Sequence, residues 1–205
     1  MTKSKYVKID DKVLYKIGNK KIGLDTLIFN MQSAHNCYCD KTKQCPFGKS
    51  GNGKCYALRN EKLYKNTLEY RERQNEYWEK STINKILLDL RNIIAKYPQI
   101  KYIRFNESGD MSGYTDLKRL ITIAETFPQI TVYTYTHNLK LFVEFGKIEL
   151  PKNLIINGSG FKWVNNYKSV PKGTIPQDGL KCKGNCRECN LCKIAHGKTI
   201  YEEIF

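Results

Sequence analysis

The sequence predicts an α/β fold with a parallel sheet, arranged as a partial β/α barrel and carrying cysteine-rich metal-binding loops. Residues 101–157 follow the order strand, helix, strand, helix, strand, which gives parallel strands with right-handed crossovers. The 205 residues suffice for one hydrophobic core but are short for a full barrel of about 250 residues. The eight cysteines gather in two segments that lack apolar periodicity.

The N-terminal segment, residues 5–30, alternates loosely between apolar and polar side chains. Such alternation is typical of strands, and Gly18-Asn19 in its middle predicts a hairpin or two short strands. Residues 33–55 lose all periodicity and hold Pro46 and several glycines. They predict a loop that something other than a hydrophobic core holds in place.

Apolar residues recur at helical spacing from residue 57 to about residue 97. One helix is expected to run through Leu58 and Tyr77. Ser81 or Thr82 is expected to cap a second helix, because their hydroxyls can accept a hydrogen bond from an open amide of the first turn.

The middle of the chain predicts three strands and two helices. The strands are expected at 101–106, 130–136 and 153–157, and the helices at about 114–126 and 139–145. The carboxyl ends of parallel strands share one edge of a sheet, where functional loops gather. The turns Glu-Ser-Gly-Asp, Thr-His-Asn and Asn-Gly-Ser-Gly, which follow the three strands, are therefore expected on one rim.

Four side chains on this rim are candidates for catalysis. Asp110 and Glu107 could act as nucleophile, base or metal ligand, with Ser108 between them. Asp110 could equally cap the helix that follows it. His137 could join the site, or it could be a hydrogen-bonded structural histidine.

Substrate binding is expected from polar and aromatic side chains on and near the same rim. Tyr133 and Tyr135 alternate with threonines, so they point to one face, where they could stack on a base or pack in the core. Basic residues across 54–80 could track phosphates, although glutamates interleave with many of them, as on a solvated helix face. The candidates are Asn106, Tyr133, Tyr135, Asn138, Ser159 and Arg59.

The chain has 35 basic and 20 acidic residues, a formal net charge of +15. Such an excess attracts polyanions, which favours nucleic acid as partner, DNA before RNA. An acidic protein partner, or a composition that is simply rich in lysine, would give the same charge. The sequence does not predict an oligomeric state.

No stretch approaches the roughly 20 apolar residues of a membrane span, and the N-terminus is polar. We therefore expect no membrane partner and a cytoplasmic location, the host cytoplasm if a phage encodes the protein. In a reducing compartment, clustered cysteines are more often metal ligands or catalytic thiols than disulfides.

The C-terminal cysteines follow the spacing Cys182-x3-Cys186-x2-Cys189-x2-Cys192, with His196 four residues later. Thiolates this close in sequence can converge on one ion without a long loop closure. The spacing fits zinc and an iron–sulfur cluster equally well. We expect these five residues to be metal ligands.

Cys37, Cys39, Cys45 and Cys55 form a looser N-terminal group. They could hold a second metal, share ligands with the C-terminal group, or be small buried residues of which one or two are unligated. The resulting organisation is an α/β domain over 1–175 with a cysteine-rich insertion at about 33–57, followed by a metal-binding segment over 176–205.

Several motifs together resemble a phage protein family described as gene-product-88-like. They are Cys45-Pro46, Cys55-Tyr56-Ala57, Arg104-Phe105-Asn106-Glu107-Ser108-Gly109-Asp110, Tyr133-Thr134-Tyr135-Thr136 and the terminal cysteine cluster. Members of that family usually carry histidine at the position of Asn106 and end in a histidine that is absent after Ile200-Tyr201. The family has no settled activity.

The chain is also similar to guanine transglycosylases, β/α barrels with a C-terminal zinc site that exchange guanine for a 7-deazaguanine. That likeness implies a DNA-modifying transferase in which Asp110 attacks the anomeric carbon of the sugar and Glu107 assists proton transfer. Zinc would then be the only metal, in a structural role. This base exchange is the sharpest function that the sequence predicts.

Two alternatives remain open at this point. The chain resembles radical S-adenosylmethionine enzymes, with Cys39, Cys45 and Cys55 on a 4Fe–4S cluster and S-adenosylmethionine as cosubstrate, although these N-terminal cysteines lack the compact Cys-x3-Cys-x2-Cys spacing. The chain could instead be a non-enzymatic nucleic-acid binder stapled by zinc, whose binding would depend strongly on salt.

Overall fold

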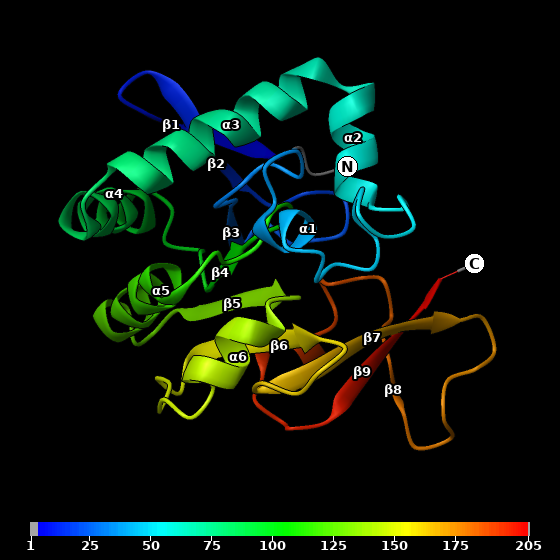
Figure 1. The fold of residues 1–205 in the computed structure, drawn as a ribbon. Helices are drawn as coiled ribbons and strands as arrows, with labels where there is room; N and C mark the ends of the chain where they lie inside the picture. The colour runs from blue at the N-terminus through cyan, green and yellow to red at the C-terminus, as the bar shows by residue number, and fades with distance from the viewer. Residues whose placement is uncertain (1–3, 205) are drawn as a thin grey trace.

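The computed structural model describes residues 4–204 and shows a mixed α/β fold on one nine-stranded sheet (Figure 1). Along the sheet the strands are β1 (Lys5–Ile9), β2 (Lys12–Ile17), β3 (Thr26–Phe29), β4 (Tyr102–Phe105), β5 (Thr131–Thr136), β6 (Leu154–Ser159), β7 (Asn165–Pro171), β9 (Thr199–Ile204) and β8 (Leu180–Lys181). β1, β2 and β3 pair antiparallel, and every pairing from β3 onward is parallel. The mostly parallel sheet is confirmed, and it ends at β1 and β8 without closing.

The crossover helices cover one face of the sheet (Figure 1). The helices are α1 (Tyr38–Lys41), α2 (Tyr56–Leu63), α3 (Lys65–Lys80), α4 (Ile83–Lys96), α5 (Tyr114–Thr126), α6 (Leu139–Phe145) and the 3-10 turn η1 (Leu191–Lys193). α3, α4 and α5 supply buried apolar residues to the same core as β2 to β6. We call this side of the sheet the helix face and the opposite side the inner face.

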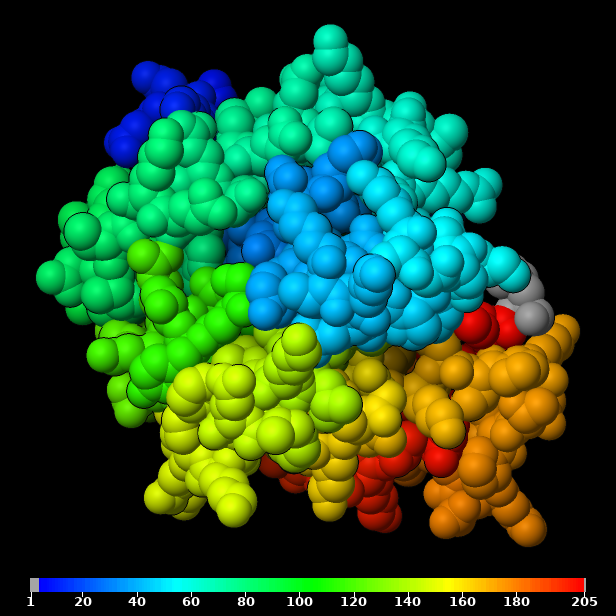
Figure 2. All heavy atoms as spheres, viewed as in Figure 1, coloured from blue at the N-terminus to red at the C-terminus, as the bar shows by residue number. Residues whose placement is uncertain are grey.

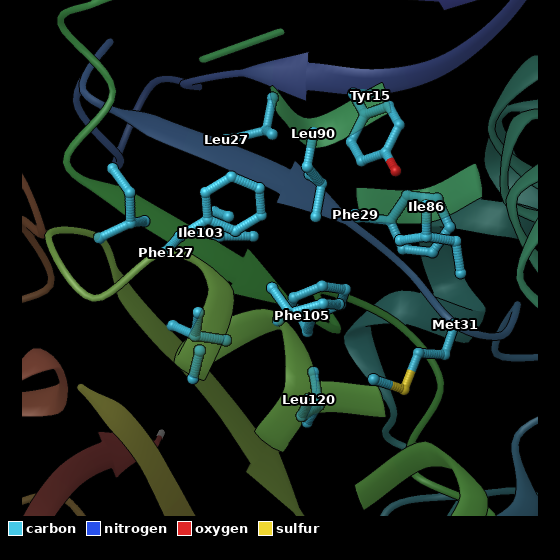
Figure 3. Packing of buried hydrophobic residues seen from close by; sticks show 14 of the residues in the cluster. Tyr15, Leu27, Phe29, Met31, Ile86, Leu90, Ile103, Phe105, Leu120 and Phe127 are labelled. Atoms are coloured by element: carbon cyan, nitrogen blue, oxygen red, sulfur yellow. The ribbon is translucent and has the colours of Figure 1, made fainter. Parts of the chain in front are cut away.

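The helix face holds a continuous hydrophobic core (Figure 3). Ile103 and Phe105 of β4 lie in it, packed with Phe29 of β3 and Leu120 of α5. Successive side chains of a strand point to opposite faces, so Arg104 lies between them on the inner face. The same alternation places Val132 in the core and Tyr133 on the inner face.

The central elements agree with the predictions, and the longest predicted helix does not. The helices at 114–126 and 139–145 are confirmed, as are the three central strands to within one or two residues. The helix expected through Leu58 and Tyr77 is two helices, because Tyr64 adopts an extended conformation (φ −129°, ψ 98°) between α2 and α3. Thr82 caps α4 by accepting the amide of Lys85, as predicted.

The C-terminal segment contributes strands that the sequence analysis did not identify. β9 pairs in parallel with β7, and Ile200 of β9 is fully buried. The stretch between β8 and β9 lies against the sheet, where the amides of Asn157 and Asn165 donate to the carbonyls of Cys192 and Ile194. This segment is thus held by sheet pairing and side-chain hydrogen bonds. Within residues 4–204, no helix has the length and apolar character that a membrane crossing needs.

Candidate functional site

Asp110 joins the carboxyl ends of β4 and β5, as the predicted rim requires. One carboxylate oxygen accepts from the Thr136 hydroxyl at 2.6 Å and from the Met111 amide at 2.7 Å, and the other accepts from the His137 amide at 2.7 Å. Burial, and next the charge of this carboxylate, raise the pKa of the Cys39 thiol above its usual value. Asp110 is 3% exposed, and burial raises its pKa above the usual value against the opposing effects of His137 and Thr136. These contacts give Asp110 a structural role at the rim.

The amide and hydroxyl of Ser108 also form hydrogen bonds, in a network that the sequence analysis did not predict. Its amide donates to Asn30, and its hydroxyl donates to Glu61 of α2 at 3.1 Å. Glu61 also accepts from the amide of Ala34 and from Arg71 at 2.9 Å, and it is buried. Burial alone would raise the pKa of Glu61, but these donors outweigh it and lower that pKa below its usual value. The network fixes α2 to the turn after β4.

Glu107 and Asn106 complete that turn. The Glu107 carboxylate accepts from Lys16 at 3.0 Å and from Asn19 at 2.6 Å, both on the β2 side. Asn106 has a left-handed backbone (φ 63°), which asparagine tolerates better than most residues, and its side chain accepts the Met31 amide. The predicted catalytic roles of Asp110, Glu107 and Ser108 stay predictions, and the polar atoms of all three are already paired.

His137 lies at the edge of an open hollow. The hollow has a volume of about 380 Å³ and is lined by Gln44, His137, Leu139, Lys140, Val143 and Glu144. Phe47 meets the His137 ring edge-on at 6.2 Å between centroids. Burial lowers the pKa of His137, so its ring favours the neutral form.

The remaining predicted binding residues are dispersed. Asn138 is buried and caps α6 by accepting the Leu141 amide. Ser159 ends β6 on the same rim, and Arg59 is exposed on α2. Among residues 4–204, Arg59 forms no hydrogen bond or cation–π contact with Tyr133 or Tyr135.

The N-terminal cysteine group lies in the loop that follows β3. Figure 2 shows this loop, in blue and cyan, at the surface between α3 and α6. Gln44 and Cys45 both donate their amides to the Cys39 carbonyl, and the Cys55 amide donates to Phe47, so the loop folds on itself. Cys39 is fully buried, while Cys37, Cys45 and Cys55 are half-buried. Burial raises the pKa of Cys37 to about 12.

The inner face presents a cluster of aromatic and cationic side chains. Arg104 and Tyr133 are direct partners on β4 and β5, and the Arg104 guanidinium lies 5.2 Å from the centre of the Tyr135 ring. Tyr135 in turn packs edge-on against Tyr167 of β7 at 5.1 Å. Tyr133 and Tyr135 do share one face, as the alternation predicts, and Tyr133 is the buried member of the pair.

The C-terminal cysteines face this cluster. Tyr167 donates its hydroxyl to Cys182 at 3.8 Å, and the Tyr135 hydroxyl is close enough to Cys192 to affect its pKa. Burial raises the pKa of Cys192 to about 12, against the lowering effect of the Tyr135 hydroxyl. The eight cysteines are all free thiols.

His196 is not placed as a metal ligand. Its Nε2 donates to the Leu191 carbonyl at 3.0 Å, and its Nδ1 accepts the Lys198 amide at 3.0 Å, so both ring nitrogens are used. More generally, residues 4–204 contain no group of three or more His, Cys, Asp or Glu side chains arranged to hold a metal ion. The predicted metal sites therefore remain predictions.

The family comparison supports the resemblance given by the motifs. The family model described as Gene product 88 matches residues 12–178, most of the chain. The chain belongs to the Gene product 88 family. The match includes the N-terminal cysteine loop and the rim, and it ends before the C-terminal cysteines. Searches of curated proteins and of solved structures found no match.

Proposed function

We propose that this Gene product 88 protein is an iron–sulfur enzyme of the radical S-adenosylmethionine type. Its cluster would bind to the loop after β3, and its substrate would bind on the inner face of the sheet. The supporting observation is position: four cysteines follow the first parallel strand, and the buried Cys39 lies near enough to Asp110 on the carboxyl rim for the carboxylate charge to raise the pKa of its thiol further above the level set by burial. Parallel α/β sheets bind ligands at this rim.

The topology supports a partial-barrel reading of the fold. β3, β4, β5, β6 and β7 lie side by side in chain order and in parallel, which is the strand order of a β/α barrel. The Cys-rich segment after β8 packs on the inner face through Asn157 and Asn165. This segment would cover the part of the inner face that additional strands enclose in a full barrel.

The donor chemistry of the loop fits a cluster with three protein ligands. Cys39 is fully buried near Asp110, so it would serve as a structural residue. Cys37, Cys45 and Cys55 are the half-buried thiols and would hold the cluster. Three cysteines leave one iron of a 4Fe–4S cluster open to a small molecule, since four normally complete the set.

Because the thiols are not yet arranged as ligands, metal binding would be coupled to closure of the loop. When bound and reduced, such a cluster supplies one electron to S-adenosylmethionine, whose C–S bond breaks to give methionine and a 5′-deoxyadenosyl radical. The chain itself would contribute the rim network around Glu61 and Asp110, which fixes the loop and α2 to the sheet.

Base exchange by a transglycosylase fits this geometry less well. That reaction needs a carboxylate free to attack a sugar, whereas both Asp110 oxygens accept hydrogen bonds and the side chain is 3% exposed. We retain nucleic acid as the proposed source of the substrate, because the net charge of +15 favours contact with a polyanion.

The test is reconstitution with iron and sulfide without oxygen, followed by iron analysis and a visible spectrum. The wild type and Cys39→Ser should bind iron and show a broad visible band. Cys37→Ser, Cys45→Ser and Cys55→Ser should each lose most of the iron. Cys39→Ser is the matched control, because Cys39 is the fully buried cysteine of the loop.

With dithionite, the iron-loaded wild type should release 5′-deoxyadenosine and methionine from S-adenosylmethionine. A protein that binds zinc alone, or whose iron content is the same in all four variants, would contradict the proposal. Zinc with salt-dependent DNA binding would instead support the non-enzymatic alternative.

A further inference from the structure

The inner face holds two polar groups that lack partners. The Nε of Arg104 and the hydroxyl of Tyr133 are both buried and form no hydrogen bond within residues 4–204. A buried polar atom without a partner costs roughly 1–3 kcal/mol, and such atoms are rare in folded proteins. The two groups are neighbours, because Arg104 and Tyr133 are register partners on parallel strands.

Arg104 forms no salt bridge with any acidic side chain of residues 4–204. The charge of Glu107 acts on Arg104, but its carboxylate is already paired with Lys16 and Asn19. The Arg104 guanidinium contacts the Tyr135 ring, which positions it without using its N–H donors. Lys193 adds a second positive charge over the ring of Tyr102 on the same strand.

We propose that Arg104 and Tyr133 bind an oxyanion of the substrate, a carboxylate or a phosphate, on the inner face of the sheet. The inference deepens the proposed function by naming the chemical class of the substrate, and it rests on that function for the reaction. A guanidinium offers N–H donors in a fork that matches the oxygens of either anion, and the Tyr133 hydroxyl adds a third donor.

The location agrees with a substrate site between the two cysteine groups. Tyr56, which directly follows Cys55, acts electrostatically on Arg104 and donates its hydroxyl to the Glu107 carbonyl. On the other side, the Tyr135 ring that contacts Arg104 packs against Tyr167, whose hydroxyl donates to Cys182. Tyr133 is 2% exposed, which suits a small anionic group and excludes the backbone of a DNA duplex.

The test is calorimetric titration of the full-length protein with inorganic phosphate and, separately, with acetate, both at constant ionic strength. We expect one site per chain for at least one of the anions. Arg104→Gln should weaken binding about tenfold or more, since it removes a charge-assisted pair. Tyr133→Phe should weaken it about tenfold, the lower end of the range for a hydrogen bond to a charged group.

Arg119→Gln is the matched control. The Arg119 guanidinium also lies 5.2 Å from an aromatic ring, that of Trp78, but it already donates to the carbonyls of Trp78 and Ser81. Its replacement should leave anion binding unchanged. A general effect of salt on a basic protein would change anion binding by Arg119→Gln as much as by Arg104→Gln. Weaker binding by Arg104→Gln alone therefore indicates a specific site.

Binding of phosphate alone identifies a phosphate group, and binding of acetate identifies a carboxylate; either outcome supports the site. Absence of binding by both anions, or equal binding by wild type and Arg104→Gln, overturns it. The titration requires neither S-adenosylmethionine nor turnover. Anion binding by a protein that takes up no iron would therefore reject the proposed reaction and support the oxyanion site. Iron uptake without anion binding would support the proposed reaction and reject the oxyanion site.

Discussion

The two faces of the sheet are formed by alternate residues of the same strands, and they differ in the kind of side chain that the central strands bury there. On the helix face, Ile103 and Phe105 are buried in a continuous core with residues of α4 and α5. On the inner face, Arg104 Nε and the Tyr133 hydroxyl are buried without a hydrogen-bond partner among residues 4–204. Adjacent residues of β4 thus face an apolar core on one side of the sheet and a polar, aromatic cluster on the other.

This difference separates stability from function along one strand. Apolar burial on the helix face supplies most of the favourable free energy of folding. Unpartnered polar groups on the inner face reduce that free energy, and a ligand can recover the loss by binding. Substitutions on the helix face should therefore change folding, and substitutions on the inner face should change binding.

The largest expected effect is on the helix face. Phe105→Ala should lower the free energy of unfolding by about 3–5 kcal/mol, because it removes a fully buried ring and leaves a cavity beside Phe29 and Trp78. Urea denaturation should show a lower midpoint with an unchanged slope. A loss below about 1 kcal/mol would show that this face is not the main core.

The second effect concerns the rim that joins the two faces. Glu61→Gln should cost about 3 kcal/mol, because it leaves the buried guanidinium of Arg71 without a counter-charge. Arg71→Met in the same background should recover part of the loss, since no charge then remains unpaired. A double variant as unstable as the sum of the two single variants would refute the coupling.

Glu61 also predicts how stability changes with pH. Its pKa is lower in the folded protein than the ordinary value of 4.5, so its contribution is complete above pH 4.5. The contribution is then lost as the pH falls through the folded pKa. Denaturation curves of the wild type between neutral and acidic pH should show this decline, and those of Glu61→Gln should show a smaller one.

The sequence predicted the rim and missed the network that holds it. Alternation in 101–106 and 130–136 gave the strands, and parallel order then brought Asp110 and His137 together. Periodicity could not show that Glu61 and Arg71 are buried, because charged residues on an amphipathic helix are normally taken to face solvent. Their burial is tolerated because Arg71 donates to Glu61, and Glu61 also accepts the amides of Ala34 and His35.

The C-terminal strands were missed for a related reason. β7 reads Asn-Asn-Tyr-Lys-Ser-Val-Pro and β9 reads Thr-Ile-Tyr-Glu-Glu-Ile, so neither offers a clear apolar run. Their partners come from distant parts of the chain, and tertiary pairing overrides weak local preference. The sequence could predict the face on which Arg104 lies, because it stands between two apolar residues of a strand. It could not predict that Arg104 Nε has no hydrogen-bond partner among residues 4–204.

The fourth prediction compares two buried aspartates. Asp110→Asn should lower stability by about 1–3 kcal/mol, because an amide NH₂ must face donors that the carboxylate accepted. Asp116 is the matched control on the helix face, where it accepts from Trp78 and Ser112. Asp116→Asn should cost a similar amount. Unchanged stability of Asp110→Asn with loss of turnover would restore Asp110 as a catalytic carboxylate.

The last prediction makes one tyrosine substitution on each face, and the smallest effect on stability is expected for Tyr133 on the inner face. Tyr77 on the helix face donates its hydroxyl to Asp89 at 2.6 Å, so Tyr77→Phe should cost about 1.5–3 kcal/mol, the range for a hydrogen bond to a charged group. Tyr133 on the inner face has no such partner, so Tyr133→Phe should change stability by less than about 0.5 kcal/mol or raise it. Thermal and urea denaturation of the two variants would measure both values. Equal losses would mean that the Tyr133 hydroxyl is already satisfied in the free protein, and Tyr133 could then not be an unpartnered donor for a ligand.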